Sequence, residues 1–145
     1  MQITTGHDLK DVTSDESKSH RSEEMPLTGR RYLLTGASRG LGQLTLTELV
    51  KRGAEVIAVA RDERRLSALQ AELGDQVIPS TLDLSKPDQV TTWAESLWKD
   101  FGPLDGVIHN AGIDDFQPIC TMSSEAITHQ VHLNLLAPLL NNRAL

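Results

Sequence analysis

A glycine-rich segment, Thr35 to Gly42 with the sequence TGASRGLG, has the residue types of a phosphate-binding turn. It follows the apolar run Tyr32 to Leu34 and leads into a helix-like stretch, which predicts a turn between a buried strand and a helix N-terminus. Glycine lets the backbone approach a ligand closely, and the free N–H groups and dipole of a helix N-terminus favour anionic oxygens. The expected ligand is a dinucleotide, although the spacing, Gly-x-x-x-Gly-x-Gly, differs from the general fingerprint.

Two arginines indicate which dinucleotide would bind. Arg39 lies within the glycine segment, and Arg61 follows the second predicted strand, where an acidic residue would instead bind the ribose 2′-hydroxyl of NAD. Guanidinium groups make charge-assisted, bidentate contacts with phosphate, so the sequence favours NADP over NAD. The alternative for Arg61 is an exposed arginine beside Asp62, which would cap the following helix.

Short apolar runs rich in β-branched residues alternate with stretches of helical period along most of the chain. This alternation is typical of a parallel sheet with helices on both faces. The predicted strands are residues 31–35, 55–60, 76–82 and 104–109, and the predicted helices are 41–52, 62–73 and 87–101, with a final helix or broken pair of helices from about 124 onward. Gly53, Gly74 and Gly102 follow the helical stretches, as helix-ending glycines do.

The helix predicted over residues 87–101 has one apolar face, because its large side chains recur at steps of three and four residues. Both of its tryptophans, Trp93 and Trp98, are therefore expected in the core rather than against a ligand. Cys120 is the only cysteine, which excludes an intramolecular disulfide and predicts a buried structural thiol in a reducing compartment.

Composition limits the classes of function. The chain has 145 residues, of which 39% are hydrophobic, and a net charge of -6, which argues against a general nucleic-acid-binding surface. No apolar stretch approaches the roughly 20 residues of a membrane-spanning helix, and we expect a cytoplasmic protein without membrane attachment. Residues 1–27 are polar, with six acidic and three basic residues, and are predicted to be a disordered tail, with a regulatory or partner-binding role as the alternative. Residues 28–145 form the predicted domain.

Four motifs in order resemble the short-chain dehydrogenase/reductase family, and the resemblance covers residues 29–145. They are the glycine segment, Asp83-Leu84 after the third strand, Asn110-Ala111-Gly112 after the fourth, and Asn134-Leu135 in the last helix. The resemblance implies an α/β fold: a Rossmann-type, doubly wound parallel sheet with strand order 3-2-1-4, incomplete after the fourth strand and the following helix. The implied cofactor-binding residues are Gly36, Ser38, Arg39, Gly40, Leu41, Gly42, Arg61, Asp83, Leu84, Asn110, Ala111 and Gly112.

Individual residues take further roles from this resemblance. Asp83 would contact the adenine amino group, with a loop-capping carboxylate as the alternative. Asn134 would be the catalytic asparagine that holds a water in a proton relay, with capping or bending of the helix before Pro138 as the alternative. His109 replaces the first Asn of the family's Asn-Asn-Ala-Gly element and is interpreted as a strand-end histidine, and no metal site is assigned.

The family's catalytic Ser and Tyr-x-x-x-Lys segment has no counterpart here, since the only tyrosine is Tyr32 in the first strand. The sequence therefore predicts the NADP-binding part of a reductase whose complete form transfers a hydride between nicotinamide and a small carbonyl or alcohol. Without the proton donor, we expect binding without turnover. Two alternatives remain: a nucleotide-binding module with a regulatory role, and a half-domain that needs a complementing chain. We also expect oligomers to form through an open strand edge and the leucine-rich last helix.

Overall fold

The computed structural model describes residues 25–144, so the predicted disorder of the tail falls outside it except at residues 25–27. Within that short stretch, Leu27 packs against one of the two hydrophobic clusters. Its backbone N–H donates to the carbonyl of Arg52 at 2.7 Å. The polypeptide therefore joins the folded domain at or before Leu27.

The helices and strands follow the predicted order, with small differences at their ends. The elements are β1 (Arg31–Thr35), α1 (Gly40–Lys51), β2 (Glu55–Ala60), α2 (Glu63–Leu73), β3 (Val77–Thr81), α3 (Pro87–Phe101), β4 (Gly106–Ile108), the 3₁₀ turn η1 (Ile119–Thr121), α4 (Ser124–Val131), the π-helical turn η2 (His132–Leu136) and α5 (Ala137–Ala144). Strand β4 is shorter than expected, because it pairs with β1 over three residues only. The glycines Gly53, Gly74 and Gly102 all have positive φ, as expected of helix-ending residues.

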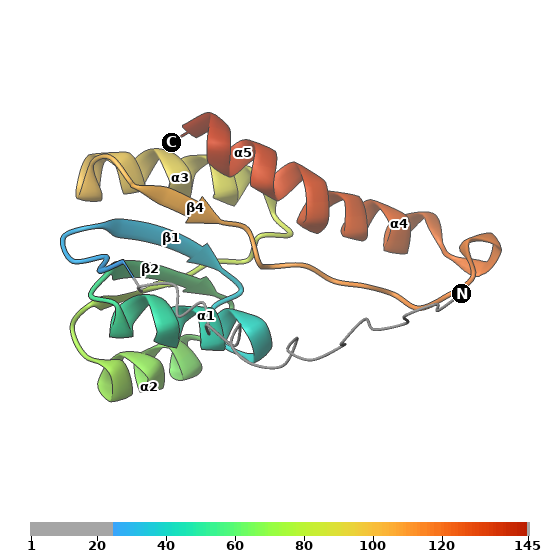
Figure 1. The fold of residues 1–145 in the computed structure, drawn as a ribbon. Coiled ribbons are helices and arrows are strands. Elements are labelled where there is room, and N and C mark those ends of the chain that lie inside the picture. Colours follow the sequence, from blue (N-terminus) through green and yellow to red (C-terminus); the bar gives the residue numbers. More distant parts are fainter. Residues whose placement is uncertain (1–24, 145) are drawn as a thin grey trace, which may run out of the picture.

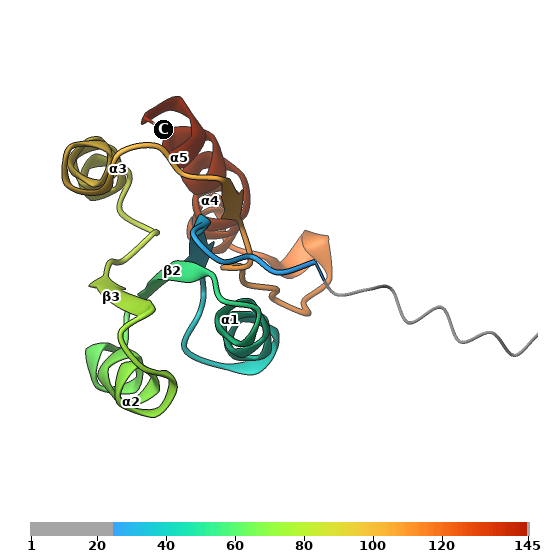
Figure 2. The ribbon, with the colours of Figure 1, turned by 60° about the vertical axis from the view of Figure 1, so that its left-hand side comes forward.

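The four strands form one parallel sheet in the order β3-β2-β1-β4, which confirms the predicted topology (Figure 1). Helices α1 and α2 lie on one face of the sheet, and α3 and α5 lie on the other (Figure 2). Because side chains alternate along a strand, Leu34 and Val56 join the cluster under α1 and α2, whereas Leu33 and Ile57 join the one under α3 and α5. The central strands β1 and β2 are largely buried and contribute side chains to both clusters, which explains their continuous apolar runs.

Two of the expected core residues lie at the surface, so those predictions are wrong. On α3, Val90, Ala94 and Leu97 are buried, but Trp98 is 48% exposed because it lies at the margin of the apolar face. Trp93 is half-buried, and its indole Nε1 donates to the hydroxyl of Ser80 at 2.8 Å. Cys120 is exposed, because it lies in η1 on the long surface connection between β4 and α4.

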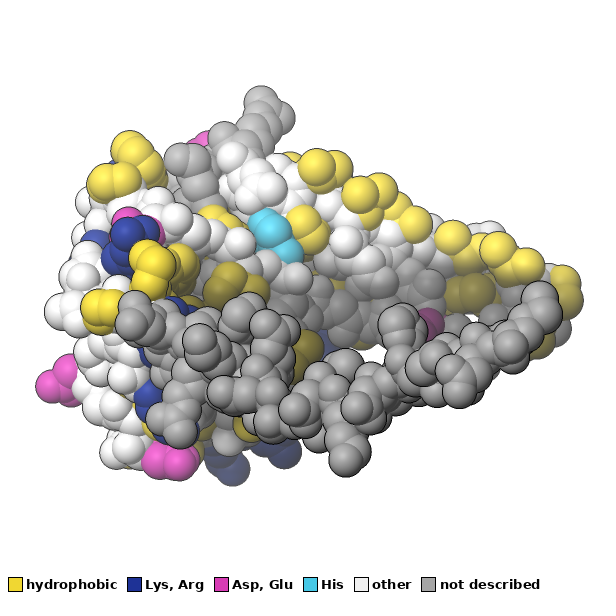
Figure 3. All heavy atoms as spheres, viewed as in Figure 1, with side chains coloured by type: hydrophobic (Ala, Val, Ile, Leu, Met, Phe, Trp, Pro, Cys, Tyr) yellow, Lys and Arg dark blue, Asp and Glu magenta, His cyan; other side chains and the backbone are white. Residues whose placement is uncertain are grey.

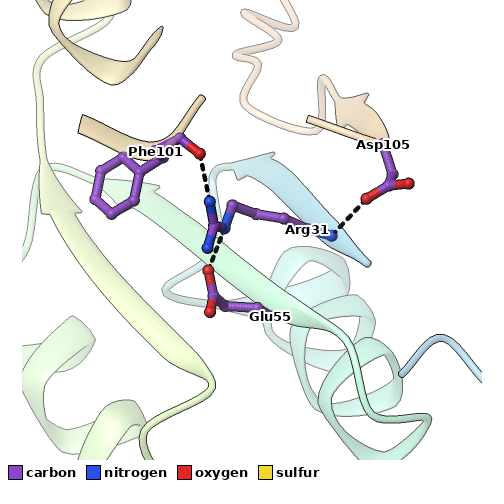
Figure 4. A network of polar contacts seen from close by, with 4 residues as sticks. All are labelled: Arg31, Glu55, Phe101 and Asp105. Atoms are coloured by element: carbon purple, nitrogen blue, oxygen red, sulfur yellow. Dashed lines mark hydrogen bonds and ion pairs between the residues drawn. The ribbon is translucent and has the colours of Figure 1, made fainter. Parts of the chain in front are cut away.

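A polar network around Arg31 ties together the edge of the sheet where the strands begin (Figure 4). The Arg31 guanidinium binds the carboxylate of Glu55 at the start of β2 and the carbonyl of Phe101 at the end of α3. It also lies 5.7 Å from the Phe101 ring centroid, within cation–π range. The Arg31 N–H donates to Asp105 at 2.8 Å, just before β4. Arg31 in β1 thus contacts the first residue of β2, the last residue of α3 and the residue just before β4.

We predict that Arg31→Met lowers the free energy of unfolding by about 1 to 2 kcal/mol, because it removes two charge-assisted hydrogen bonds and the cation–π contact from a half-buried site. Glu55→Gln keeps an acceptor for the guanidinium and should cost less than about 1 kcal/mol, as expected of a partly exposed ion pair. Urea denaturation of both variants measures the difference. Equal losses for the two would show that the ion pair alone carries the effect.

Candidate cofactor-binding site

The turn between β1 and α1 has a backbone that suits glycine at two positions. Gly36 has φ +69° and Gly40 has φ +55°, both in the left-handed region that other residues rarely adopt. Between them, the N–H of Ala37 donates to the carbonyl of Val59 at 3.1 Å. This bond fixes the turn to the end of β2.

Gly42 has no room for a side chain, for a different reason. A Cβ atom at Gly42 would lie 2.1 Å from the carbonyl oxygen of Gly36 and 2.5 Å from Nδ2 of Asn110. A Cβ atom at Gly36 would lie 2.9 Å from the Cα of Ala111. Around Gly40, by contrast, a Cβ would have no atom of the described residues within 4 Å, apart from its chain neighbours and the backbone of its own helix. The turn is therefore packed closely on its inner side and open at Gly40.

The N-terminus of α1 opens on this turn with its backbone donors free for a ligand. Arg39 is the N-cap residue in extended conformation, and among residues 25–144 no side chain caps the helix. The first turn of the helix contains no acidic residue that would repel an anion. Unpaired N–H groups and the positive end of the helix dipole are the elements of a phosphate site, so this turn fits a dinucleotide pyrophosphate.

Asn110 and Thr35 lock the turn against the end of β4. The Asn110 Nδ2 donates to the carbonyls of Thr35 at 3.2 Å and Gly36 at 3.1 Å. Thr35 is 1% exposed, and its hydroxyl accepts from the N–H groups of Asn110 and Ala111, both at 3.1 Å. It also donates to the carbonyl of Ile108 at 3.4 Å. Thr35 was not among the predicted site residues, although a hydroxyl residue directly before the glycines at a buried strand end was a usable signal.

Asn134 holds the backbone that leaves this site. Its Oδ1 accepts from the N–H of Ile113 at 3.0 Å, and its Nδ2 donates to the carbonyl of Ile113 at 2.8 Å. Both the oxygen and the nitrogen of the side-chain amide therefore hold the connection after Gly112 in place. Asn134 lies in η2, where the helix widens to a π-helical turn before Pro138. The contacts with Ile113 give Asn134 a positioning role. The water-relay role that the family resemblance implies for it stays a prediction.

Asp83 follows β3 and forms a tight turn with Ser85. Its Oδ1 accepts from the Ser85 hydroxyl at 2.7 Å and from the Ser85 N–H at 3.1 Å. The hydroxyl contact is the main reason that the pKa of Asp83 lies below its usual range; partial burial opposes this shift, while the Ser85 N–H and the charges of Lys86 and Arg61 support it. Asp83 thus has the loop-capping contacts of the alternative interpretation, and it is ionised at neutral pH.

The remaining predicted residues lie around the same edge. Arg39 and Arg61 are exposed, and Asp62 caps α2 by accepting from the N–H of Arg65 at 3.1 Å. Leu41 is 71% exposed in the first turn of α1, whereas Leu84 is buried in the core. In a parallel sheet all strands end at one edge, and the arrows of Figure 1 show this for β1, β2 and β4. The sheet therefore gathers the predicted cofactor residues along its carboxyl edge, where open α/β sheets bind ligands.

Comparisons with known proteins agree with this geometry. Residues 30–145 match the family model described as short chain dehydrogenase. The chain is 33% identical over 99 residues to a 3-oxoacyl-(acyl-carrier-protein) reductase of Haemophilus influenzae, which corresponds to 68% of this chain and 41% of that protein. It is 35% identical over 114 residues to the L-xylulose reductase of Mus musculus, which corresponds to 79% of this chain and 45% of that protein. The chain thus spans less than half the length of these two curated relatives.

Solved structures with the same fold contain bound nicotinamide nucleotides. A metagenomic short-chain oxidoreductase in complex with NADP matches with a TM-score of 0.77 and 33% identity, over 82% of this chain and 56% of that one. A 3-ketoacyl-(acyl-carrier-protein) reductase of Brucella melitensis, complexed with NADH, matches with a TM-score of 0.73 and 30% identity, over 81% of this chain and 48% of that one. With the glycine turn, the parallel sheet and the family match over residues 30–145, this chain belongs to the short-chain dehydrogenase family.

Proposed function

We propose that this chain is the NADP-binding part of a short-chain reductase. The observation that carries the proposal is the turn at the start of α1. Its inner side is packed against the Asn110 amide and leaves no room for a side chain at Gly42, whereas the turn is open at Gly40. The bound nicotinamide would supply or accept the hydride exchanged with a carbonyl or an alcohol. The NADP and NADH complexes of the related structures support a nicotinamide nucleotide in general, and the choice of NADP rests on the arginines.

Each part of the nucleotide has a proposed set of partners. The backbone donors of Gly40, Leu41 and Gly42 would hold the pyrophosphate. Arg39 and Arg61 would pair with the 2′-phosphate, because both guanidinium groups are exposed at the carboxyl edge of the sheet. Asp83 would accept from the adenine amino group. The backbone of Asn110, Ala111 and Gly112 would line the groove between the two halves of the site.

Hydride transfer to a substrate is proposed for the complete form of such a reductase. The only tyrosine of the 145 residues is Tyr32, which is half-buried in β1 and so is not placed to donate a proton at the carboxyl edge. A positioned acid or base typically contributes about 10²- to 10⁴-fold to such a reaction. The 145 residues are therefore expected to bind the nucleotide without reducing a carbonyl. A regulatory binding module and a half-domain with a complementing chain remain as alternatives, and a cytoplasmic location stays a prediction.

The surface of the last helical segment, from α4 to α5, carries a row of exposed apolar side chains. Ile127, Val131, Leu135 and Leu139 recur every four residues along α4, η2 and α5 and are all exposed, with Leu135 at 56% and Leu139 at 57%. Figure 3 shows hydrophobic side chains in a row over these elements. In the described part of the chain no helix is long and apolar enough to cross a membrane. An exposed apolar row of this length favours association with another protein surface, and we propose a second copy of this chain.

The first prediction tests the choice of nucleotide. Fluorescence titration of the purified chain should give tighter binding of NADPH than of NADH, because Arg39 and Arg61 can pair with the 2′-phosphate. Arg61→Asp should reverse this preference, since it places a carboxylate against the phosphate and opposite the free 2′-hydroxyl of NADH. Arg64→Asp is the matched control, with the same change of charge in the first turn of α2, and should keep the preference for NADPH. Equal affinities for the two nucleotides in the parent chain would contradict the assignment.

The second prediction separates the two interpretations of Asp83. Asp83→Asn keeps an Oδ1 that can accept from Ser85, but it replaces the second carboxylate oxygen with a donor that would face the adenine amino group. We expect NADPH to bind roughly tenfold more weakly, as for loss of a hydrogen bond to a charged group, with little change in urea stability. Ser85→Ala should have the opposite profile, with reduced stability and nearly unchanged binding. If Asp83→Asn binds NADPH as well as the parent, Asp83 is a loop cap only.

The third prediction concerns association. Sedimentation velocity of the chain should show dimers or larger species, because the exposed row on α4, η2 and α5 needs an apolar partner. Leu135→Glu with Leu139→Glu should shift the distribution toward monomer. Leu41→Glu changes an even more exposed leucine on α1 and should leave the distribution as it is. A sharp monomer boundary for the parent chain would rule out the proposed association and would favour the binding-module alternative.

A further inference from the structure

Two neighbouring residues at the end of β4 make contacts on opposite faces of the sheet. Ile108 packs with the cluster under α1 and α2, and Val107 packs with the cluster under α3 and α5. Continuing the alternation places His109 on the α5 side and Asn110 on the α1 side. The hydrogen bonds agree: Nε2 of His109 lies 3.0 Å from Oδ1 of Asn142 in α5, while the Asn110 amide binds the glycine turn.

The segment from His109 to Ile113 is therefore held from several directions. Thr35 binds two of its N–H groups from β1, and Asn134 binds both backbone groups of Ile113 from η2. The contact between His109 and Asn142 adds α5, which is anchored by Ala137 and Leu140 in the core cluster. Unlike the others, this contact joins two side chains. Because His109 directly precedes Asn110, the contact restrains the backbone from which the Asn110 amide reaches the turn.

We propose that His109 is a positioning residue of the cofactor site. Its imidazole holds the end of β4 to α5, and this restraint keeps Asn110 aligned with the carbonyls of Thr35 and Gly36. The inference rests on the proposed NADP-binding function. It assigns to α5 a part in cofactor binding that needs no contact between that helix and the nucleotide.

The test compares two replacements of His109 in the full chain. His109→Phe keeps a ring of similar size but removes the hydrogen bond, whereas His109→Gln places an amide near the position of Nε2. Loss of one partly exposed hydrogen bond corresponds to roughly a three- to tenfold change in an equilibrium constant. We therefore expect NADPH to bind three- to tenfold more weakly to His109→Phe and within about twofold of the parent to His109→Gln. Combining His109→Phe with Asn142→Ala should weaken binding no further than His109→Phe alone.

Amide hydrogen exchange of the nucleotide-free chain gives a readout that does not depend on binding. His109→Phe should speed exchange at the N–H groups of Asn110, Ala111 and Ile113 by a similar factor, with exchange in β2 unchanged. Glu55→Gln is the control at the opposite edge of the sheet and should alter neither these amides nor the affinity for NADPH. Faster exchange at all amides of the sheet would assign His109 to general stability and overturn the proposal.

The outcomes separate this inference from the proposed function. If the parent binds NADPH and His109→Phe changes neither affinity nor local exchange, the positioning role is wrong and the cofactor assignment stands. If the parent fails to bind either nucleotide but His109→Phe speeds local exchange, the cofactor assignment is wrong and the restraint on the segment stands. Weaker binding with faster local exchange, both restored in His109→Gln, supports the two together.

Discussion

The carboxyl edge of the sheet depends on the contact of one side-chain amide with a glycine turn. Asn110 donates to two successive carbonyls, those of Thr35 and Gly36, and it approaches Gly42 so closely that a Cβ atom there would lie 2.5 Å from its nitrogen. Carbonyl groups that turn away from strand pairing need such a partner, because a buried carbonyl without one costs free energy. The same contact directs the turn so that its N–H groups, rather than its carbonyls, face outward at the start of α1.

The two edges of the sheet are built from different chemistry. Where the strands begin, Arg31 joins β1 to Glu55 and Phe101 by charge and ring contacts between residues far apart in the sequence. Where the strands end, the neutral groups of Thr35 and Asn110 hold the glycine turn, and the arginines Arg39 and Arg61 are exposed. This division suits a binding site, since an arginine paired within the protein has less charge to offer an anionic ligand, whereas Arg39 and Arg61 are exposed.

Much of the fold could be read from the sequence, because the central strands are largely buried and appear as apolar runs that end in turn residues. The bounds of β1, β2 and α3 follow from those patterns, whereas the strand order was expected from the family resemblance. Trp98 and Cys120 were misjudged for one shared reason: residue type indicates a preference for burial, but exposure depends on which surface a neighbouring element covers. At the site, the glycines and Asn110 could be identified from their motifs. The contact of His109 with Asn142 could not, because it joins residues 33 positions apart through a helix whose rotation the sequence does not fix.

That rotation is set by the π-helical turn η2. A π-helical turn contains one more residue than an α-helical turn, so it changes the phase of everything that follows. Within this turn Asn134 faces Ile113, and downstream of it Ala137 enters the core while Asn142 meets His109. Each residue of an α-helix turns by about 100°. Removing a single residue from η2 would therefore rotate the two halves of the helix against each other by about a quarter turn, so that Ile113 and the core could not both keep their partners. The position of η2 in the fold therefore constrains the length of this segment more than the identity of its leucines.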